Sequence, residues 1–326
     1  MNVSIITTVL NEADNIERFL CSVLAQTLMP YEIIVVDGGS TDGTIDIISG
    51  LAAKHNNLKL IVIKGANRSI GRNTAIDNSL SDIIVCVDAG CYFMPDWLEN
   101  LLKPLRDDCI GLAFGLCTAQ THNIFQECLS VFGAPHPEDI DTNTFLPSSR
   151  SIAFRKEYWK KAGGYPEQYY KNEDTPFDIA LKKVGCHFAL AKEAKFLWEP
   201  RCNFQELFRQ QYNYAVGDGE GRILFPVYWK TSAFYLGILL LISIILMQKM
   251  CFFLLVPLII IIGYHFRYFY IGKKRLGKKN IFWPMLKVIT GMDLGNVLGF
   301  WKGYIWSIVN RRSFCNMKDR IQDIGR

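Results

Sequence analysis

The sequence predicts an α/β protein in which a mostly parallel sheet with flanking helices precedes a transmembrane helical hairpin and an amphipathic tail. Three patterns lead to this prediction. Short β-rich runs alternate with helix-like segments over the first 120 residues, two of the runs end in an aspartate, and two long apolar stretches follow residue 225. Strands that alternate with helices form βαβ units, which build parallel sheets.

Strands are expected where apolar and β-branched residues cluster in short runs, at Val3–Thr8, Tyr31–Asp37, Leu58–Ile63, Asp82–Asp88 and Ile110–Thr118. Helices are expected at Glu12–Gln26 and Thr44–Lys54, where apolar residues recur about every 3.6 positions. Ligands of a parallel sheet bind outside the carboxyl ends of its strands. We therefore expect Asp37 and Asp88, which end the second and fourth strands, to face one crevice.

The composition excludes several other classes of protein. Of the 326 residues 50% are hydrophobic, which excludes a disordered chain, and a net charge of +5 is too small to indicate nucleic-acid binding. The ten cysteines form no C-x-x-C pair, which argues against a zinc ribbon or a redox pair. The N-terminus shows no signal-peptide pattern, so we expect the amino-terminal domain in the cytosol.

Two stretches without a charged residue, Ala233–Met247 and Cys251–Tyr264, predict a pair of membrane-spanning helices. Extended to Tyr228–Met247 and Cys251–Ile271, each helix would measure about 30 Å, the thickness of the hydrocarbon layer. A buried helical pair in a soluble protein is the alternative. Tyrosine and tryptophan side chains at both ends of the pair favour the membrane.

Basic residues without an acidic one follow the hairpin between Arg267 and Lys279, and the positive-inside rule places them in the cytoplasm. We expect a cytosolic domain at residues 1–225, a hairpin at 226–272, and a basic, interfacial amphipathic tail at 273–326. The two-helix hairpin makes the chain a multi-pass protein, which we expect at the cytoplasmic face of the inner membrane. For the tail, a third membrane span is the alternative to an interfacial helix.

The first two motifs follow the first two predicted strands. Glu12 lies in the segment Thr8–Ile16, where a strand passes into a helix, and Asp37 lies in EIIVVDGGSTDGT. A carboxylate at a strand end can accept hydrogen bonds from a nucleobase or a ribose, and glycines let a ligand approach closely. Asp42 or Thr44 is also expected to cap the following helix.

The third motif contains Arg68 and Arg72 and is followed by VDAG, with Asp88 as its acid. Arginine forks suit phosphate oxygens, and an acid beyond them can hold a divalent ion that bridges a diphosphate. The fourth motif brings Glu173 and Asp174 to the start of an amphipathic helix. An acidic helix start that complements the helix dipole is the simpler reading of that motif taken alone.

Together the four motifs resemble the family 2 glycosyltransferases, which are inverting enzymes with the Rossmann-like GT-A fold. The resemblance covers about Val3 to Gly221 and is most specific in EIIVVDGGSTDGT, in Gly71–Asn73 before VDAG, and in AFRKEYWKKAGGYPE before NED. It implies a nucleotide-sugar donor and a membrane-anchored, bacterial-type enzyme.

The resemblance also implies roles for the acidic and basic residues. Asp37 and Arg72 would contact the nucleotide, with Glu12 nearby, and Asp88 would lie at the ribose and diphosphate with a Mg or Mn ion. Asp174 matches the general base that deprotonates the acceptor hydroxyl, and Glu173 is expected to orient the acceptor or tune that base.

The chain departs from the family pattern at three places. Gly90 replaces the second acid of the metal motif, which puts the metal in doubt, and Gly38 replaces an acid after the second strand. The segment Arg209–Tyr214 lacks the Arg-Trp pair of the processive synthases' Q-x-x-R-W signature, which favours the transfer of one sugar per event.

The function expected from the sequence is inverting, non-processive transfer of one sugar to a lipid-linked or nascent cell-surface glycan. Its partners would be the donor, the acceptor and membrane lipids, with no nucleic acid. Two alternatives stay open: a polyprenyl-phosphate glycosyltransferase, and an inactive scaffold that binds nucleotide-sugar. No G-x-G-x-x-G follows the first strand, which argues against a dehydrogenase.

Overall fold

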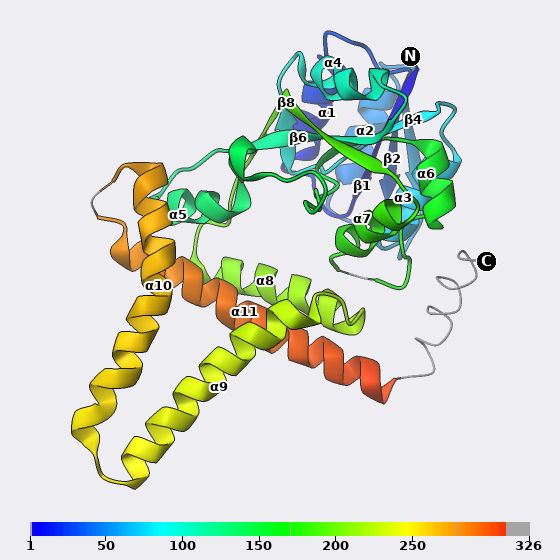
Figure 1. Cartoon of the computed structure of the whole chain (residues 1–326). Helices are drawn as coiled ribbons and strands as arrows, with labels where there is room; N and C mark the ends of the chain where they lie inside the picture. Colours follow the sequence, from blue (N-terminus) through cyan, green and yellow to red (C-terminus); the bar gives the residue numbers. More distant parts are fainter. Residues whose placement is uncertain (1, 170, 279, 311–326) are drawn as a thin grey trace. The chain divides into compact units, whose positions relative to one another are not determined.

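The computed structural model of the protein describes residues 2–169, 171–278 and 280–310 (Figure 1). The chain forms two compact units. The first consists of residues 1–120 and 134–199, and the second of residues 121–133 and 200–326. The predicted domain boundaries at residues 225 and 272 stay a prediction, and the end of the predicted tail, 311–326, lies outside the described residues.

The first unit is built on a mixed sheet that has eight strands among the described residues, in the order β3-β2-β1-β4-β7-β6-β8-β5. The strands are β1 (Val3–Val9), β2 (Glu32–Asp37), β3 (Leu58–Val62), β4 (Ile83–Val87), β5 (Cys91–Phe93), β6 (Ile110–Ala119), β7 (Ser151–Arg155) and β8 (His187–Trp198). The first four in this order and the pair β6–β8 are parallel, while β7 and β5 run antiparallel to their neighbours. The predicted α/β fold is confirmed, and the five expected strands are all present.

Helices cover both faces of this sheet because its central strands alternate their side chains between two cores. In β1, Ile5 belongs to the core that includes α1 and α4, whereas Ile6 belongs to the core that includes α3 and α7. The helices of this unit are α1 (Ile16–Leu24), α2 (Thr44–Ala52), α3 (Arg68–Asp77), α4 (Trp97–Leu102), α6 (Lys156–Ala162) and α7 (Asp174–Lys183), with short 3₁₀ turns at Lys103–Arg106 and Pro137–Asp139.

The register of the parallel strands brings three loops to one edge of the sheet. Val9 of β1 pairs with Asp37 of β2, and Ile6 of β1 pairs with Cys86 of β4. Asp88, two residues beyond Cys86, therefore emerges at the level of Thr8. The carboxyl ends of β1, β2 and β4 meet where a ligand of a doubly wound sheet binds.

The second unit is helical. Its helices are α5 (Ile124–Gly133), α8 (Phe204–Glu220), α9 (Phe225–Met247), α10 (Leu255–Leu276) and α11 (Phe282–Val309), with a 3₁₀ turn at Cys251–Leu254. By length and composition α9 and α10 can cross a membrane, with mean hydropathies of 2.0 and 1.4 over their most apolar windows. These two helices correspond to the predicted hairpin. Helix α11, the alternative third span, is longer but does not reach the hydropathy of a candidate span.

Helix α11 packs closely against α8 because glycines replace side chains at the contact (Figure 1). A Cβ on Gly295 would lie 2.8 Å from the Cβ of Gln211 and 2.9 Å from the carbonyl oxygen of Phe208. One on Gly299 would collide with the carbonyl of Tyr212. The glycine repeat of the tail therefore lets the two backbones approach each other.

Polar contacts join the candidate hairpin to α11. The hydroxyl of Tyr235 in α9 donates to Asp293 at 2.8 Å, and the indole N–H of Trp301 donates to Ser232 Oγ at 2.8 Å. Burial raises the pKa of Asp293, and the hydrogen bond from Tyr235 helps to oppose that shift. Trp301 also packs against an aromatic cluster that contains Phe225, Tyr228 and Phe300.

The close packing of α8 and α11 predicts that a single methyl group will destabilise this unit. We expect Gly299→Ala to lower stability by about 1–3 kcal/mol, because its Cβ meets backbone that cannot rotate away. Gly237→Ala in α9 is the matched control, since nothing lies within 4 Å of the added Cβ. Thermal unfolding of the full-length protein in detergent measures both. Equal melting temperatures for the two variants would contradict the contact.

Candidate active site

The last residue of β2, Asp37, is hydrogen-bonded to the loop that follows it. The carboxylate of Asp37, which is fully buried, accepts hydrogen bonds from the backbone N–H groups of Gly39 and Ser40 and from the Ser40 hydroxyl, each at 2.7 Å. Gly39 has φ near 99°, a left-handed conformation that suits glycine. Asp37 therefore shapes the turn through which β2 reaches α2.

The loop after β1 lies against this turn. Asp42 accepts from the backbone N–H of Ala13 at 3.0 Å, and the backbone N–H of Glu12 donates to the Thr44 hydroxyl at 2.9 Å. Asp42 also accepts from Thr44, whereas the N-cap position of α2 is Gly43, whose φ is 98°. The expected role of Asp42 is thus wider than a helix cap, because it also joins the two loops.

Helix α3 brings an arginine to the strand ends. Gly71 allows this approach, because a Cβ there would lie 2.5 Å from the Thr8 side chain of β1. The helix begins after Asn67, whose side chain caps it by accepting from the N–H of Ile70 at 2.9 Å. Arg72, the next residue after Gly71, is therefore held below the protein surface with 1% of its side chain exposed.

Three carboxylates converge on the Arg72 guanidinium. Its Nη1 lies 2.7 Å from Glu173 Oε1 and 2.7 Å from Asp174 Oδ1, and its Nη2 lies 2.9 Å from Asp88 Oδ1. Glu173 and Asp174 come from the start of α7, more than 80 residues from Asp88 in the sequence. The third and fourth sequence motifs thus meet at one guanidinium. We call Arg72, Asp88, Glu173 and Asp174 the Arg72 cluster.

The neighbouring Asn73 fixes the segment that leads to α7. Its amide oxygen accepts from the backbone N–H of Tyr165 at 2.8 Å and from the Trp159 indole at 3.1 Å, and its NH₂ donates to Glu167 Oε1 at 2.9 Å. The Tyr165 ring in turn stacks on Phe177 of α7 with centroids 3.8 Å apart. The G-R-N and G-G-Y-P-E motifs are therefore parts of one packed assembly.

The members of the Arg72 cluster differ in exposure and in proton affinity. Burial raises the pKa of Glu173, which is 3% exposed, although Arg72 opposes this shift. Burial would also raise the pKa of Asp174, but Arg72 and hydrogen bonds from Ser149 outweigh it and lower that pKa below its ordinary value. Asp174 is therefore the member of the pair whose charged form is favoured more strongly, and its side chain is 21% exposed.

The other predicted residues surround the cluster. Asp88 is its most open member, with 40% of its side chain exposed. Arg68, exposed at the start of α3, has favourable charge interactions with Glu12, Glu173 and Asp174. Burial raises the pKa of Glu12, against the opposing effects of Asn15 and Arg68. Asp37 is set apart from this group, because its hydrogen bonds are made within its own turn.

Sequence reasoning did not single out Ser149 or Asp178. Asp178 lies one turn after Asp174 on α7, is 1% exposed, and has both carboxyl oxygens buried without a hydrogen-bond partner among the described residues. Burial holds its pKa well above the ordinary value, and the charge of Asp174 adds to that shift. The surroundings of Asp178 therefore favour the protonated form of its carboxyl. The sequence feature that could have identified Asp178 is its position four residues after Asp174, which places both side chains on one face of the helix.

The donor set for a metal is sparse. Among the described residues no group of three or more His, Cys, Asp or Glu side chains is arranged to hold a metal ion. Asp88 nevertheless fits Mg or Mn, because carboxylate oxygens suit these ions and Mg is commonly bound by one or two carboxylates with waters and substrate phosphates. A Cβ on Gly90 would meet nothing within 4 Å. The space around this position therefore does not require a glycine.

Comparisons with known proteins show which family the chain belongs to. The family model "Glycosyl transferase family 2" matches residues 4–162. The glycosyltransferase AglE of Haloferax volcanii is 34% identical over 232 residues, which cover 67% of this chain and 72% of that protein. The succinoglycan biosynthesis protein ExoA of Rhizobium meliloti is 28% identical over 229 residues, or 65% of this chain and 68% of that protein.

Among solved structures, the mannosyltransferase PcManGT from Pyrobaculum calidifontis, in complex with GDP-Man and Mn²⁺, has a similar fold. The TM-score is 0.52 at 22% identity, and the match covers 66% of this chain and 62% of that one. The fold, the extent of the match to AglE and the family model confirm what the motifs indicated, and the chain belongs to the family 2 glycosyltransferases.

Proposed function

We propose that this glycosyltransferase moves one sugar, with inversion, from a nucleotide-sugar donor to a lipid-linked or nascent cell-surface glycan. The observation that carries the proposal is the Arg72 cluster. Arg72 holds Asp88, which ends β4, and Asp174, which begins α7, through one guanidinium. The carboxylate proposed for the donor, Asp88, and the carboxylate proposed for the acceptor, Asp174, are thereby kept at a fixed separation.

On the donor side we assign the nucleotide to the strand-end loops of β1 and β2. Asp37 keeps these loops in shape and is the proposed partner of the base or ribose, with Glu12 beside it. Arg68 is exposed and cationic, which suits a phosphate oxygen. Arg72 is buried and paired, so a direct nucleotide contact stays a prediction, and its geometry favours action through the carboxylates.

On the acceptor side Asp174 is the proposed general base. It would take the proton of an acceptor hydroxyl while that oxygen bonds to the anomeric carbon and the bond to the diphosphate breaks. The lowered pKa supports this role because it keeps Asp174 ionised near neutral pH. Glu173, beside it and more deeply buried, is proposed to hold the guanidinium in place and thereby orient the base.

Asp88 is the proposed ligand of a divalent cation, Mg or Mn, at the donor diphosphate. Such an ion would neutralise the charge that develops on the leaving diphosphate. The exposed carboxylate of Asp88 supports this assignment, as does the Mn²⁺ in the complex of the similarly folded mannosyltransferase.

The membrane helices support an acceptor that stays at a membrane surface. The chain carries two candidate spans, and one of its relatives is a succinoglycan biosynthesis protein. We place the catalytic unit on the cytoplasmic side of the cell membrane, where nucleotide-sugars are made available. A polyprenyl-phosphate acceptor is the second candidate, and the complete Arg72 cluster argues against an inactive scaffold.

The role of Asp174 is tested by replacing one carboxyl and keeping its neighbour. We expect Asp174→Asn to lower the transfer rate about 10²–10⁴-fold, because an amide cannot accept the proton. Donor affinity should change little. Transfer from a panel of nucleotide-sugars and equilibrium donor binding measure the two effects separately.

Asp178→Asn is the matched control on the same helix face, since burial disfavours the charged form of Asp178 and an amide preserves its shape. We expect it to retain transfer. Substantial transfer by Asp174→Asn would place the base elsewhere, and the absence of binding to any nucleotide-sugar by the native protein would refute the proposed function.

The metal assignment is tested at Asp88 and Gly90. We expect Asp88→Asn to abolish the effect of Mn²⁺ on donor binding, because it removes the charged ligand. Gly90→Asp should lower the Mn²⁺ concentration needed for half-maximal donor binding, since a side chain fits there and adds a second carboxylate. Gly90→Asn controls for size. An unchanged Mn²⁺ response in Asp88→Asn would assign the metal to other ligands.

A further inference from the structure

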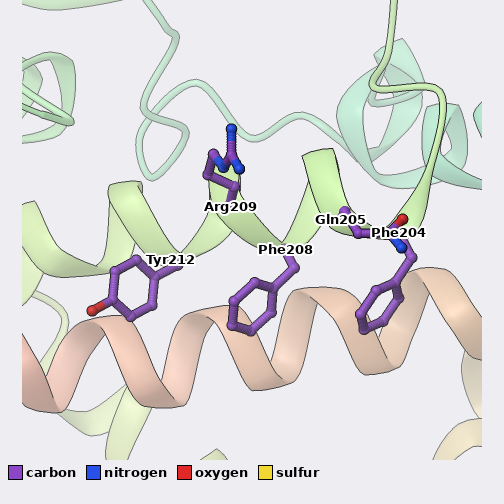
Figure 2. Close-up of a pocket in the computed structure, with 5 residues that line it drawn as sticks. All are labelled: Phe204, Gln205, Phe208, Arg209 and Tyr212. Atoms are coloured by element: carbon purple, nitrogen blue, oxygen red, sulfur yellow. The ribbon is translucent and has the colours of Figure 1, made fainter.

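The second unit carries a groove on α8 that the donor chemistry does not use. Its volume is about 310 Å³, and it is lined by Phe204, Gln205, Phe208, Arg209 and Tyr212 (Figure 2). This lies at the lower end of the range for small-molecule sites, about 300–1,000 Å³. Helices α8 and α11, together with the candidate spans α9 and α10, belong to the same compact unit.

The floor of the groove is a row of aromatic rings. Phe204, Phe208 and Tyr212 recur every four residues on one face of α8, with neighbouring centroids 6.3 and 6.0 Å apart. They lie beside the glycine face of α11, where a Cβ on Gly291 would be only 3.2 Å from the Phe204 ring. Figure 2 shows the three rings pointing toward α11. The glycines therefore make room for a continuous apolar strip.

The groove is also positively charged. Arg209 points away from the ring row in Figure 2, and its exposed guanidinium makes no ion pair with any residue that the structure describes. The ammonium of Lys302 in α11 lies 5.5 Å from the centroid of the Tyr212 ring. The nearest acid along α8, Glu206, accepts a hydrogen bond from the Asn203 amide through its carboxylate and does not line the groove.

We propose that this groove binds the phosphate and the adjoining hydrocarbon of a single-chain lipid phosphate, the carrier part of a lipid-linked acceptor. The aromatic strip suits a hydrocarbon chain, and Arg209 suits the phosphate by a charge-assisted hydrogen bond. The small volume admits part of one chain, which favours a single-chain carrier over a diacyl phospholipid. The proposal rests on the proposed function and names the class of acceptor for it.

Binding of farnesyl phosphate to the full-length protein, in nanodiscs of phosphatidylcholine, tests the groove. We expect Arg209→Gln to weaken this binding by roughly tenfold or more, because the phosphate loses a charged donor. Arg209→Lys should restore part of it. Arg201→Gln is the matched control, since Arg201 is an exposed arginine of the same unit outside the groove.

Farnesol, which lacks the phosphate, should bind more weakly and be indifferent to Arg209→Gln. Equal farnesyl phosphate binding by Arg209→Gln and the native protein would overturn the proposal, as would equally strong competition by dioleoyl phosphatidic acid, which would indicate a membrane phospholipid. Phe208→Leu adds a second variant that keeps the helix apolar, and native-like binding by it would also count against the aromatic floor.

Donor binding separates this proposal from the proposed function. If the protein binds a nucleotide-sugar and Asp174→Asn abolishes transfer, the proposed function stands even when Arg209→Gln has no effect on lipid binding. If the protein binds no nucleotide-sugar, the proposed function is refuted whatever the groove binds.

Discussion

A buried guanidinium is the constraint on which the catalytic unit depends. Taking Arg72 out of water carries a large desolvation cost, which only close opposite charges can offset. Those charges come from the end of β4 and from the start of α7, so the sheet and the helix must meet at one point. Removing one partner of a buried pair commonly costs about 3–5 kcal/mol. The same ion pairs that hold the fold thus set the separation of Asp88 and Asp174.

Glycine makes the decisive approaches possible in both units. In the first unit Gly71 lets α3 lie against Thr8, which delivers Arg72 to the strand ends. In the second unit the glycines of α11 let its backbone lie against that of α8, and the aromatic row of α8 fills the space beside them. In each unit a glycine lets two elements approach closely, because no Cβ stands between their backbones, and this approach fixes the position of a large side chain nearby.

Two aspartates on α7 show how environment separates similar groups. Asp174 faces Arg72 and Ser149, which lower its pKa, whereas Asp178, one turn later, is buried without a hydrogen-bond partner among the described residues, and its pKa is raised. Two aspartates whose pKa values are shifted in opposite directions thus occupy one helix face. The difference arises from what packs against each carboxyl, as desolvation and charge pairing shift a pKa in opposite directions.

The sequence alone determined the α/β class, the five expected strands, the two apolar helices and the family, because each depends on local periodicity or on motifs that are contiguous in the chain. It also indicated that Asp37 and Asp88 lie at the carboxyl ends of two strands of a mostly parallel sheet. It did not reveal that Arg72 would be buried among three carboxylates, that Asn73 would hold the G-G-Y-P-E segment, or that Asp178 would be buried. Those features join residues 92 to 102 positions apart or depend on burial, so only tertiary packing, which sets distance and desolvation, could decide them.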